Sequence, residues 1–216
     1  MIRYAITNRA LYPGSEQEKQ AALLAEATRW IADHIDYIQL REKDLPAAAL
    51  ATIARKLLQT INLTASPTRL LINSRPDIAL ATNAHGVHLS SSPAELTPAQ
   101  VDDLSISANH PVPLITISCH TLADVQRART ENVDAILFAP VFEKPLPNQQ
   151  PLPGQGLDQL RAACLAAAPI PIYALGGVTL KNIPSCLEAG ATGIAGIRLF
   201  HRSAESLLTS PKSLMP

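Results

Sequence analysis

Short runs of consecutive hydrophobic residues alternate with longer stretches of helical pattern along the chain. The runs are hydrophobic at nearly every position rather than at alternate positions, which is typical of parallel strands buried on both faces. Helix-start signals lie between them: Ser15 and Glu18 form a capping box, and Pro46 begins an alanine- and leucine-rich stretch. The predicted strands are 4–7, 37–40, 70–73, 86–89, 114–118, 135–138, 171–175 and 193–196.

The predicted helices follow most of these strands and span 15–31, 46–59, 76–82, 122–131, 156–167, 180–189 and 204–208. Eight strands, each followed by a helix or a polar turn, are the number that closes a (β/α)8 TIM barrel. An open doubly wound sheet has the same periodicity and stays the alternative. No linker interrupts the alternation, so we expect one α/β domain over 1–210 and a C-terminal tail over 211–216.

The composition is that of a globular protein with a large core and no excess of charge. Of the 216 residues, 47% are hydrophobic and 17% are charged, and 18 basic residues balance 18 acidic ones. Binding to nucleic acid needs a basic excess, so nucleic acid is excluded as a partner. No apolar run reaches the roughly 18–20 residues of a membrane span. The N-terminus lacks a signal-peptide pattern, so we expect a cytoplasmic protein without membrane contact.

Polar residues and glycines follow several of the predicted strands. In a barrel, the carboxyl ends of all strands meet at one mouth, and active sites lie there. The candidates for substrate binding, phosphate binding or catalysis are Gln39, Arg41, Lys43, Asn73, Ser118, His120, Gly176, Gly177, Gly196 and Arg198.

The spacing of Gln39, Arg41 and Lys43 indicates an anion site. Alternate side chains of an extended segment point to one face, so two cations and an amide donor would lie together. Such a set suits a phosphate or a pyrophosphate. The alternative is a solvated charged turn in which Glu42 and Asp44 pair with the two cations.

Two glycine-containing turns favour the same chemistry. Gly176 and Gly177 follow the seventh predicted strand, and Gly196 ends the eighth, with Arg198 two residues beyond. Glycines let backbone N–H groups approach a phosphate, and the start of a following helix adds partial positive charge. We therefore predict phosphate binding at these turns.

His120 is the candidate for proton transfer, because it lies just beyond the fifth predicted strand, two residues after Ser118. An imidazole titrates near neutral pH and can both accept and release a proton. His85 and His88 flank the fourth predicted strand. Acidic clusters suited to Mg²⁺ are missing from the strand ends, so the sequence predicts no metal ligands.

A proline-rich segment, residues 143–155, follows the sixth predicted strand. Long loops at the carboxyl ends of barrel strands commonly serve the active site, so a lid is one interpretation. A stiff surface loop without a role in the site is the other.

Six short motifs together resemble the thiamine-phosphate synthase superfamily, and their order and spacing cover nearly the whole chain. They are Tyr37-Ile-Gln-Leu-Arg-Glu-Lys-Asp44, Leu71-Ile-Asn73, Ala84-His-Gly-Val-His88, Ile117-Ser-Cys-His-Thr121, Phe138-Ala-Pro-Val-Phe142 and Ala174-Leu-Gly-Gly-Val178. The resemblance implies a (β/α)8 barrel that handles thiamine precursors. The synthase branch joins a pyrimidine pyrophosphate to a thiazole phosphate with Mg²⁺. The TenI-like thiazole tautomerase branch shifts a proton to aromatise a carboxythiazole phosphate and needs no metal.

The resemblance to the synthase branch is strong in its pyrophosphate-binding residues. Gln39, Arg41, Lys43 and Asn73 match that set, and Ser118 matches a serine of the synthase site. These positions imply that the chain binds the anion that a synthase binds.

The chain departs from the synthase pattern in the residues that hold Mg²⁺. The aspartate expected after the asparagine is Ser74, and a Gly-Gln-Glu-Asp run is replaced by Ser90-Ser-Ser-Pro93. A Thr-x-Thr-Lys run is replaced by Lys144-Pro-Leu-Pro147, and a serine near the last phosphate turn by Arg198. A divalent ion between two carboxylates neutralises the charge that grows on a leaving pyrophosphate. These replacements argue against the synthase reaction.

The resemblance therefore favours the tautomerase, an isomerase without a cofactor, in which His120 matches the catalytic histidine. One alternative is a synthase, a transferase, whose Mg²⁺ is held by other groups such as Glu95 or Glu143. Another is a non-catalytic relative in which Arg198 either strengthens phosphate binding or fills the pocket. The expected partner is a phosphorylated thiazole small molecule, and the superfamily suggests a homo-oligomer.

Overall fold

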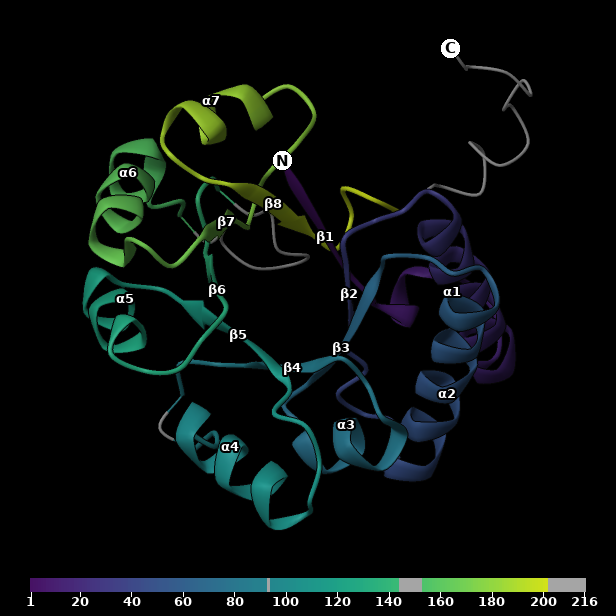
Figure 1. Cartoon of the computed structure of the whole chain (residues 1–216). Helices are drawn as coiled ribbons and strands as arrows, with labels where there is room; N and C mark the ends of the chain where they lie inside the picture. The colour runs from purple at the N-terminus through teal and green to yellow at the C-terminus, as the bar shows by residue number, and fades with distance from the viewer. Residues whose placement is uncertain (93, 144–152, 202–216) are drawn as a thin grey trace.

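Eight parallel strands close into a barrel at the centre of the molecule (Figure 1). The computed structural model describes residues 1–92, 94–143 and 153–201. Each strand pairs with its neighbours in chain order, and the last pairs with the first, which confirms the predicted closed barrel. The strands are β1 (Ile2–Ile6), β2 (Tyr37–Leu40), β3 (Arg69–Asn73), β4 (Gly86–Leu89), β5 (Leu114–Cys119), β6 (Ala135–Phe138), β7 (Ile172–Ala174) and β8 (Gly193–Gly196).

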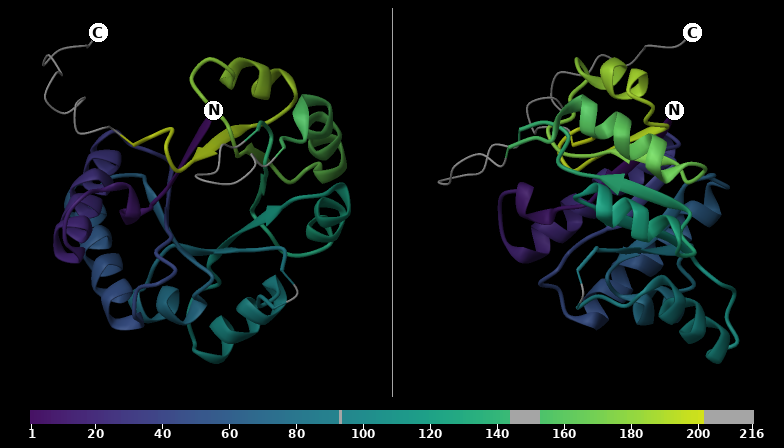
Figure 2. Two further views of the ribbon diagram at one scale, coloured as in Figure 1. Left: turned by 180° about the vertical axis from the view of Figure 1, so that it is seen from behind. Right: turned by 90° about the vertical axis from the view of Figure 1, so that its left-hand side faces the viewer.

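Helices form an outer ring around the strands (Figures 1 and 2). They are α1 (Glu16–Ala32), α2 (Ala47–Leu63), α3 (Pro76–Thr82), α4 (Pro98–Ser107), α5 (Leu122–Arg129), α6 (Gly156–Ala167) and α7 (Ile183–Glu188). A short 3-10 turn, η1 (Arg9–Leu11), follows β1. Because all strands are parallel, their carboxyl ends lie at one end of the barrel, and the loops after them form its mouth.

Most predicted helices agree with the structure apart from their ends. α1 begins at the predicted capping box, in which the Ser15 hydroxyl accepts from the Glu18 N–H and the Glu18 carboxylate accepts from the Ser15 N–H. Pro46 is the N-cap of α2 rather than its first helical residue, and α2 continues beyond the predicted end to Leu63. α7 is shorter than the predicted helix over 180–189 and begins only at Ile183.

α4 was not predicted from the sequence, although its start carries a clear signal. The Thr97 hydroxyl accepts from the Gln100 N–H, and the Gln100 side chain accepts from the Thr97 N–H, which makes a capping box. The apolar residues of α4 do not form one buried stripe, because Leu104 and Ile106 are exposed while Val101 is buried. The predicted helix over 204–208 and the predicted tail over 211–216 lie outside the described residues.

The hydrophobic core has two layers, one inside the barrel and one between the barrel and the helices. Successive strand residues point to opposite faces, so Tyr4 and Ile6 belong to the inner layer and Ala5 to the outer one. Both faces of each strand are therefore buried. This explains why the strands are continuous hydrophobic runs rather than alternating ones.

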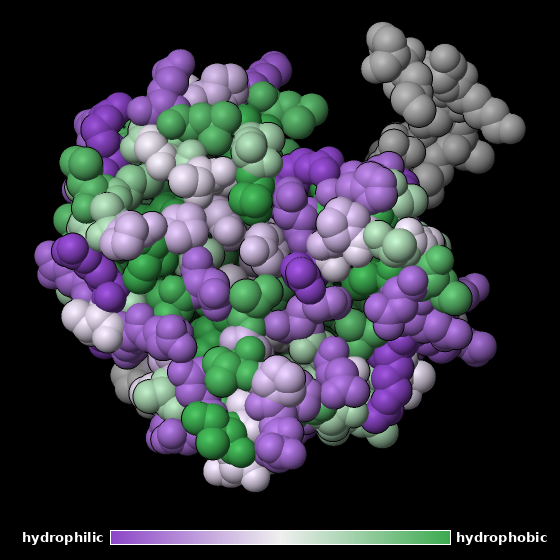
Figure 3. Space-filling model, viewed as in Figure 1, coloured by the Kyte–Doolittle hydropathy of each residue, from purple (hydrophilic) through white to green (hydrophobic). Residues whose placement is uncertain are grey.

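The outer surface mixes hydrophilic and hydrophobic side chains over the face shown in Figure 3. The most exposed large hydrophobic residues described, Leu63, Leu165 and Leu180, come from different parts of the chain. Within the described ranges, no helix is both long enough and apolar enough to cross a membrane.

Candidate active site

Two amide side chains meet where β2 and β3 end. Gln39 is buried, and its Nε2 donates to Asn73 Oδ1 at 3.1 Å. Asn73, the last residue of β3, donates from Nδ2 to the Ser74 hydroxyl at 3.0 Å. The two amides predicted to bind an anion are therefore adjacent and orient each other.

A carboxylate extends this hydrogen-bonded chain. Glu95, in the loop between β4 and α4, accepts through Oε2 from the Ser74 hydroxyl at 2.7 Å and from the Ser90 hydroxyl at 3.0 Å. The Ser90 N–H donates to the same oxygen at 3.3 Å. The serines that replace two expected positions of the synthase pattern thus hold an acidic group from farther along the chain. Glu95, one possible metal ligand from the sequence, is thus located beside Ser74 and Ser90.

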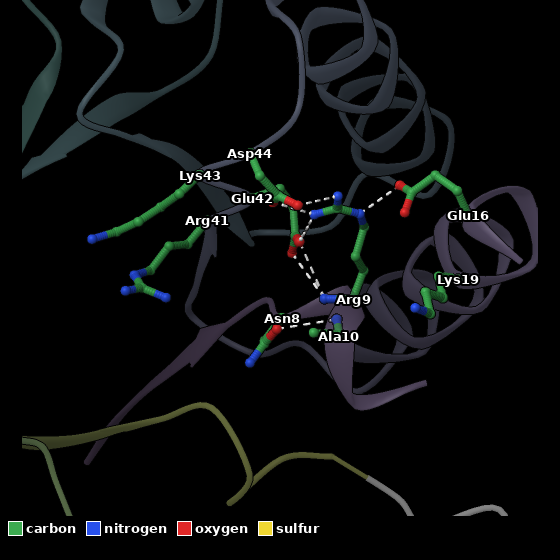
Figure 4. Close-up of a pocket in the computed structure, with 9 residues that line it drawn as sticks. All are labelled: Asn8, Arg9, Ala10, Glu16, Lys19, Arg41, Glu42, Lys43 and Asp44. Carbon is green, nitrogen blue, oxygen red and sulfur yellow. Dashed lines mark hydrogen bonds and ion pairs between the residues drawn. The ribbon is translucent and has the colours of Figure 1, made fainter. Parts of the chain in front are cut away.

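Arg41 and Lys43 extend in the same direction from the segment after β2 (Figure 4). Arg41 is half-buried and Lys43 is exposed. Neither side chain forms an ion pair with a carboxylate in the described part of the chain. This arrangement agrees with the prediction that both cations share one face.

Glu42 and Asp44 point the other way and contact Arg9, which follows β1. The alternative in which these two acids neutralise Arg41 and Lys43 is therefore wrong. A pocket of about 200 Å³ lies between the loops after β1 and β2, and it is lined by both sets of side chains.

A chain of polar side chains leads from the barrel interior to Ser118. The Tyr4 hydroxyl lies 3.0 Å from Thr116 Oγ1, which lies 2.8 Å from His88 Nδ1. The other ring nitrogen, His88 Nε2, lies 2.9 Å from Ser118 Oγ. His88 lies within β4 and points inward, rather than at the flank of the strand as expected from the sequence.

Burial keeps the His88 ring neutral. Burial lowers the pKa of His88 to about 3, and the positive charge of Arg41 acts in the same direction. A neutral imidazole has one donor and one acceptor nitrogen, so His88 orients the hydroxyls of Thr116 and Ser118 rather than carrying charge.

His120 lies at the mouth, and one of its two ring nitrogens is hydrogen-bonded. Its Nδ1 is 2.8 Å from the carbonyl oxygen of Ala139, which can only accept, so Nδ1 carries the proton. The Gln155 side chain donates to the same carbonyl at 3.0 Å. His120 is exposed. Because Nδ1 carries the proton in the neutral ring, Nε2 is the proton acceptor. This geometry is compatible with the predicted proton transfer.

The Gly176-Gly177 turn packs against the loop after β6. Both glycines have positive φ, +91° and +63°. A Cβ on Gly176 would lie 2.7 Å from Pro140 Cα, and one on Gly177 would lie 2.7 Å from the Glu143 carbonyl oxygen. The turn thus needs glycine for its own conformation and packing, in addition to any role in phosphate binding.

The predicted helix start beside this turn is wrong. α7 begins at Ile183, and the Asn182 side chain, rather than a helix end, closes the turn by donating to the Gly177 carbonyl at 3.0 Å. The helix dipole falls off within the first turn, so it contributes little at Gly176 and Gly177.

The turn after β8 has a buried glycine and an exposed cation. A Cβ on Gly196 would lie 2.7 Å from Leu199 Cβ, so this glycine also has a packing reason. Arg198 is exposed and forms no ion pair with any carboxylate of the described residues. The structure therefore leaves Arg198 accessible to an anion rather than buried in the barrel.

The described residues contain no group of three or more His, Cys, Asp or Glu side chains that could hold a metal by themselves. Residues 144–152 of the proline-rich segment lie outside the described part, so its interpretation as a lid stays a prediction.

A closed (β/α)8 barrel with cations, amides and glycine turns at the carboxyl ends of its strands is typical of barrels that bind phosphorylated small molecules. The model of the thiamine monophosphate synthase family matches residues 4–200. The chain belongs to this family, which confirms the superfamily that the sequence motifs indicated; the TenI-like branch is not confirmed.

The curated relatives agree with this family, and a solved structure agrees with the fold. A protein of Geobacter sulfurreducens, provisionally named a thiamine-phosphate synthase, is 39% identical over 192 residues, which are 89% of this chain and 83% of that protein. The thiamine-phosphate synthase of Salinibacter ruber is 36% identical over 189 residues, covering 83% and 74%. The thiamine phosphate pyrophosphorylase structure from Pyrococcus furiosus has a TM-score of 0.74 at 24% identity over 91% of this chain and 85% of that one, and it supports the fold.

Proposed function

We propose that this chain is a thiamine-phosphate synthase, a transferase that joins a pyrimidine pyrophosphate to a thiazole phosphate. One observation carries the proposal: Arg41 and Lys43 lie at the mouth without carboxylate partners among the described residues, while Ser74 and Ser90 hold the carboxylate of Glu95. The names of the relatives agree with this function better than with the tautomerase that the sequence analysis favoured.

The residues after β2 and β3 would bind the pyrophosphate. Arg41 and Lys43 supply positive charge, and the Gln39 and Asn73 amides, which orient each other, supply donors. The reaction releases pyrophosphate, so negative charge grows on the leaving group. Preorganised cations at that position stabilise the transition state more than the ground state.

The donor set around Glu95 fits Mg²⁺ when pyrophosphate is also bound. Mg²⁺ prefers oxygen ligands and is commonly held by one or two carboxylates together with substrate phosphates. Glu95, with the hydroxyls of Ser74 and Ser90, offers one carboxylate and two further oxygens. When bound, Mg²⁺ would neutralise charge on the pyrophosphate. With a single carboxylate, we expect the protein to bind Mg²⁺ weakly without that anion.

The thiazole phosphate would bind at the turns after β7 and β8. Gly176 and Gly177 expose backbone there, and Arg198 is accessible and unpaired among the described residues. Positive charge on Arg198 would replace the hydroxyl of the serine expected at this turn.

The thiazole tautomerase is the second candidate, and the geometry of His120 favours it. Because the Ala139 carbonyl holds Nδ1–H, the neutral ring presents Nε2 as a base at an exposed position. A proton shift within a bound thiazole phosphate needs this base and a phosphate site but no metal.

A coupled assay separates the two functions. Pyrimidine pyrophosphate, carboxythiazole phosphate and Mg²⁺ are mixed with the protein, and thiamine phosphate is measured by oxidation to a fluorescent product. We expect product without any added synthase. No product alone, but faster product from the unaromatised isomer when an authentic synthase is added, would refute the synthase and establish the tautomerase.

Variants of two histidines strengthen the assay. His120→Asn removes the base at the mouth, whereas His110→Asn changes a ring near α4 that contacts Asn83 and Pro111. If tautomerisation is the activity, only His120→Asn abolishes it. If synthesis is the activity, Mg²⁺ dependence accompanies product formation in both the wild type and His110→Asn.

A further inference from the structure

Arg9 contacts three carboxylates from one nearly buried guanidinium (Figure 4). Its side chain is 8% exposed. Nη1 and Nη2 donate to the two oxygens of Asp44, each at 2.7 Å, and Nη1 also donates to Glu42 Oε2 at 3.0 Å. Nε donates to Glu16 Oε1 at 2.6 Å. Arg9 therefore links the loop after β1 to the segment after β2 and to the start of α1.

The Glu42 carboxylate is fixed by further donors from the loop after β1. The Thr7 hydroxyl donates to Glu42 Oε1 at 2.7 Å, and the Arg9 N–H lies 3.2 Å and 3.1 Å from the two carboxylate oxygens. The same Thr7 hydroxyl accepts from the Arg41 N–H at 2.9 Å. The backbone between Arg41 and Glu42 is thus held in one orientation relative to β1.

This orientation decides which way each side chain of the segment points. Glu42 and Asp44 are held toward Arg9, whereas Arg41 and Lys43 extend to the other side, in a segment that ends in a turn in which the Leu45 N–H donates to the Glu42 carbonyl. The two acids are the nearest sequence neighbours of the two cations. Their attachment to Arg9 leaves the cations with no carboxylate partner in the described structure.

Without the guanidinium, both acids would lose the cation that they bind, although Glu42 would keep the Thr7 hydroxyl and the Arg9 N–H as donors. Glu42 is nearly buried, and an unpaired buried carboxylate is strongly unfavourable. Asp44 has a side chain that is 75% exposed and is free to rotate once released. Arg41 and Lys43 are the cations next to Asp44 on the same segment, and Lys19 lines the same pocket, so an Asp44 released from Arg9 would pair with these cations and lower the positive charge at the mouth.

We propose that Arg9 is a positioning residue for anion binding: it sequesters Glu42 and Asp44, and so keeps Arg41 and Lys43 available to a phosphate or pyrophosphate. The identity of the substrate rests on the proposed function, but the effect on anion affinity does not require turnover. Arg9 itself faces the acids and does not contact the anion.

Titration calorimetry with inorganic pyrophosphate tests the proposal on the whole chain. We expect Arg9→Met to weaken pyrophosphate binding about tenfold, with partial recovery in Arg9→Lys because one ammonium can still pair with a carboxylate. Arg3→Met is the matched control. Arg3 joins the first strand to Asp36 and His34, close to the start of β2, at the opposite end of the barrel. This control should keep the wild-type affinity.

A triple variant separates sequestration from a merely structural role. In Arg9→Met/Glu42→Gln/Asp44→Asn, the competing charges are gone, so pyrophosphate affinity should return to within about threefold of the wild type. The charge-matched control Arg9→Met/Asp158→Asn/Glu188→Gln removes two exposed acids on α6 and α7 and should stay as weak as Arg9→Met. Circular dichroism melting checks that each variant is folded.

The outcomes distinguish the two proposals. A wild-type chain that does not bind pyrophosphate overturns both the synthase function and the role of Arg9. Pyrophosphate binding that Arg9→Met leaves unchanged overturns the role of Arg9 alone. A triple variant as weak as Arg9→Met also overturns sequestration, because Arg9 would then act by holding the loop. Recovery in the triple variant supports sequestration even if the coupled assay detects no synthesis.

Discussion

Replacing His88 by asparagine should flatten the pH dependence of stability. His88 lies inside the barrel between Thr116 and Ser118, and burial lowers its pKa to about 3 from the ordinary 6.5. Between these two values, the unfolded chain binds a proton that the folded chain does not. The stability that neutral His88 contributes is therefore fully present above pH 6.5 and is lost as the pH falls toward 3.

The size of the effect follows from the displacement of the pKa. Each pH unit over which one extra proton binds the unfolded chain lowers the unfolding free energy by about 1.4 kcal/mol. From pH 7 to pH 4.5, the contribution of His88 therefore amounts to about 2.5 kcal/mol. An asparagine can hydrogen-bond to the same hydroxyls but does not titrate, so the variant lacks this loss.

Urea denaturation followed by the fluorescence of Trp30, the single tryptophan, measures both proteins across this pH range. We expect the wild type to lose about 2.5 kcal/mol more than His88→Asn between pH 7 and pH 4.5. Thr116→Val is the control: it removes a hydroxyl partner of His88 but keeps the ring, so it should retain the wild-type slope. Parallel curves for the wild type and His88→Asn would refute the neutral, buried imidazole.

Three further predictions concern the mouth. Glu95→Gln should weaken pyrophosphate binding about tenfold in Mg²⁺ and leave Mg²⁺-free binding unchanged; equal effects in both titrations would contradict a metal role. Arg41→Gln should weaken pyrophosphate binding without Mg²⁺ and reduce its dependence on salt; an unchanged salt dependence would place the anion elsewhere. Gly177→Ala should lower the unfolding free energy by more than 1 kcal/mol in urea, because its Cβ would meet the Glu143 carbonyl at a positive φ; wild-type stability would contradict the turn geometry.

The fold could be predicted because the hydrophobic runs that identify single strands are the same runs that a closed barrel requires. The strand runs are continuous since each strand is buried on two faces, and eight of them with intervening helices admit few arrangements. α4 escaped notice because its exposed Leu104 and Ile106 break the amphipathic pattern that identifies helices. Its capping box was the signal that could have located it.

Only those site residues that lie at the carboxyl ends of strands could be predicted from the sequence. Arg41 and Lys43 were found because period-two spacing predicts one face for them; they do extend in the same direction, although residues 43 and 44 form a turn rather than extended backbone. Arg9 was missed because its importance depends on contacts to Glu42 and Asp44, which lie more than thirty residues away. His88 was missed because a strand-end rule looks past the strand, whereas this ring points into the barrel from within β4.

Glu95 shows that the loss of a carboxylate from a sequence motif does not mean that the site lacks a carboxylate. The sequence comparison places Ser74 and Ser90 where the synthase pattern differs, and from sequence alone this means lost carboxylates. In the folded chain, both serines donate to one Glu95 oxygen, so a carboxylate occupies the same hydrogen-bonded cluster. A leaving pyrophosphate requires positive charge beside it, and a Mg²⁺ that supplies this charge requires a carboxylate ligand, which loops of different length can deliver from different positions. The Mg²⁺ dependence of pyrophosphate binding in Glu95→Gln therefore tests function more directly than the residue identities at positions 74 and 90.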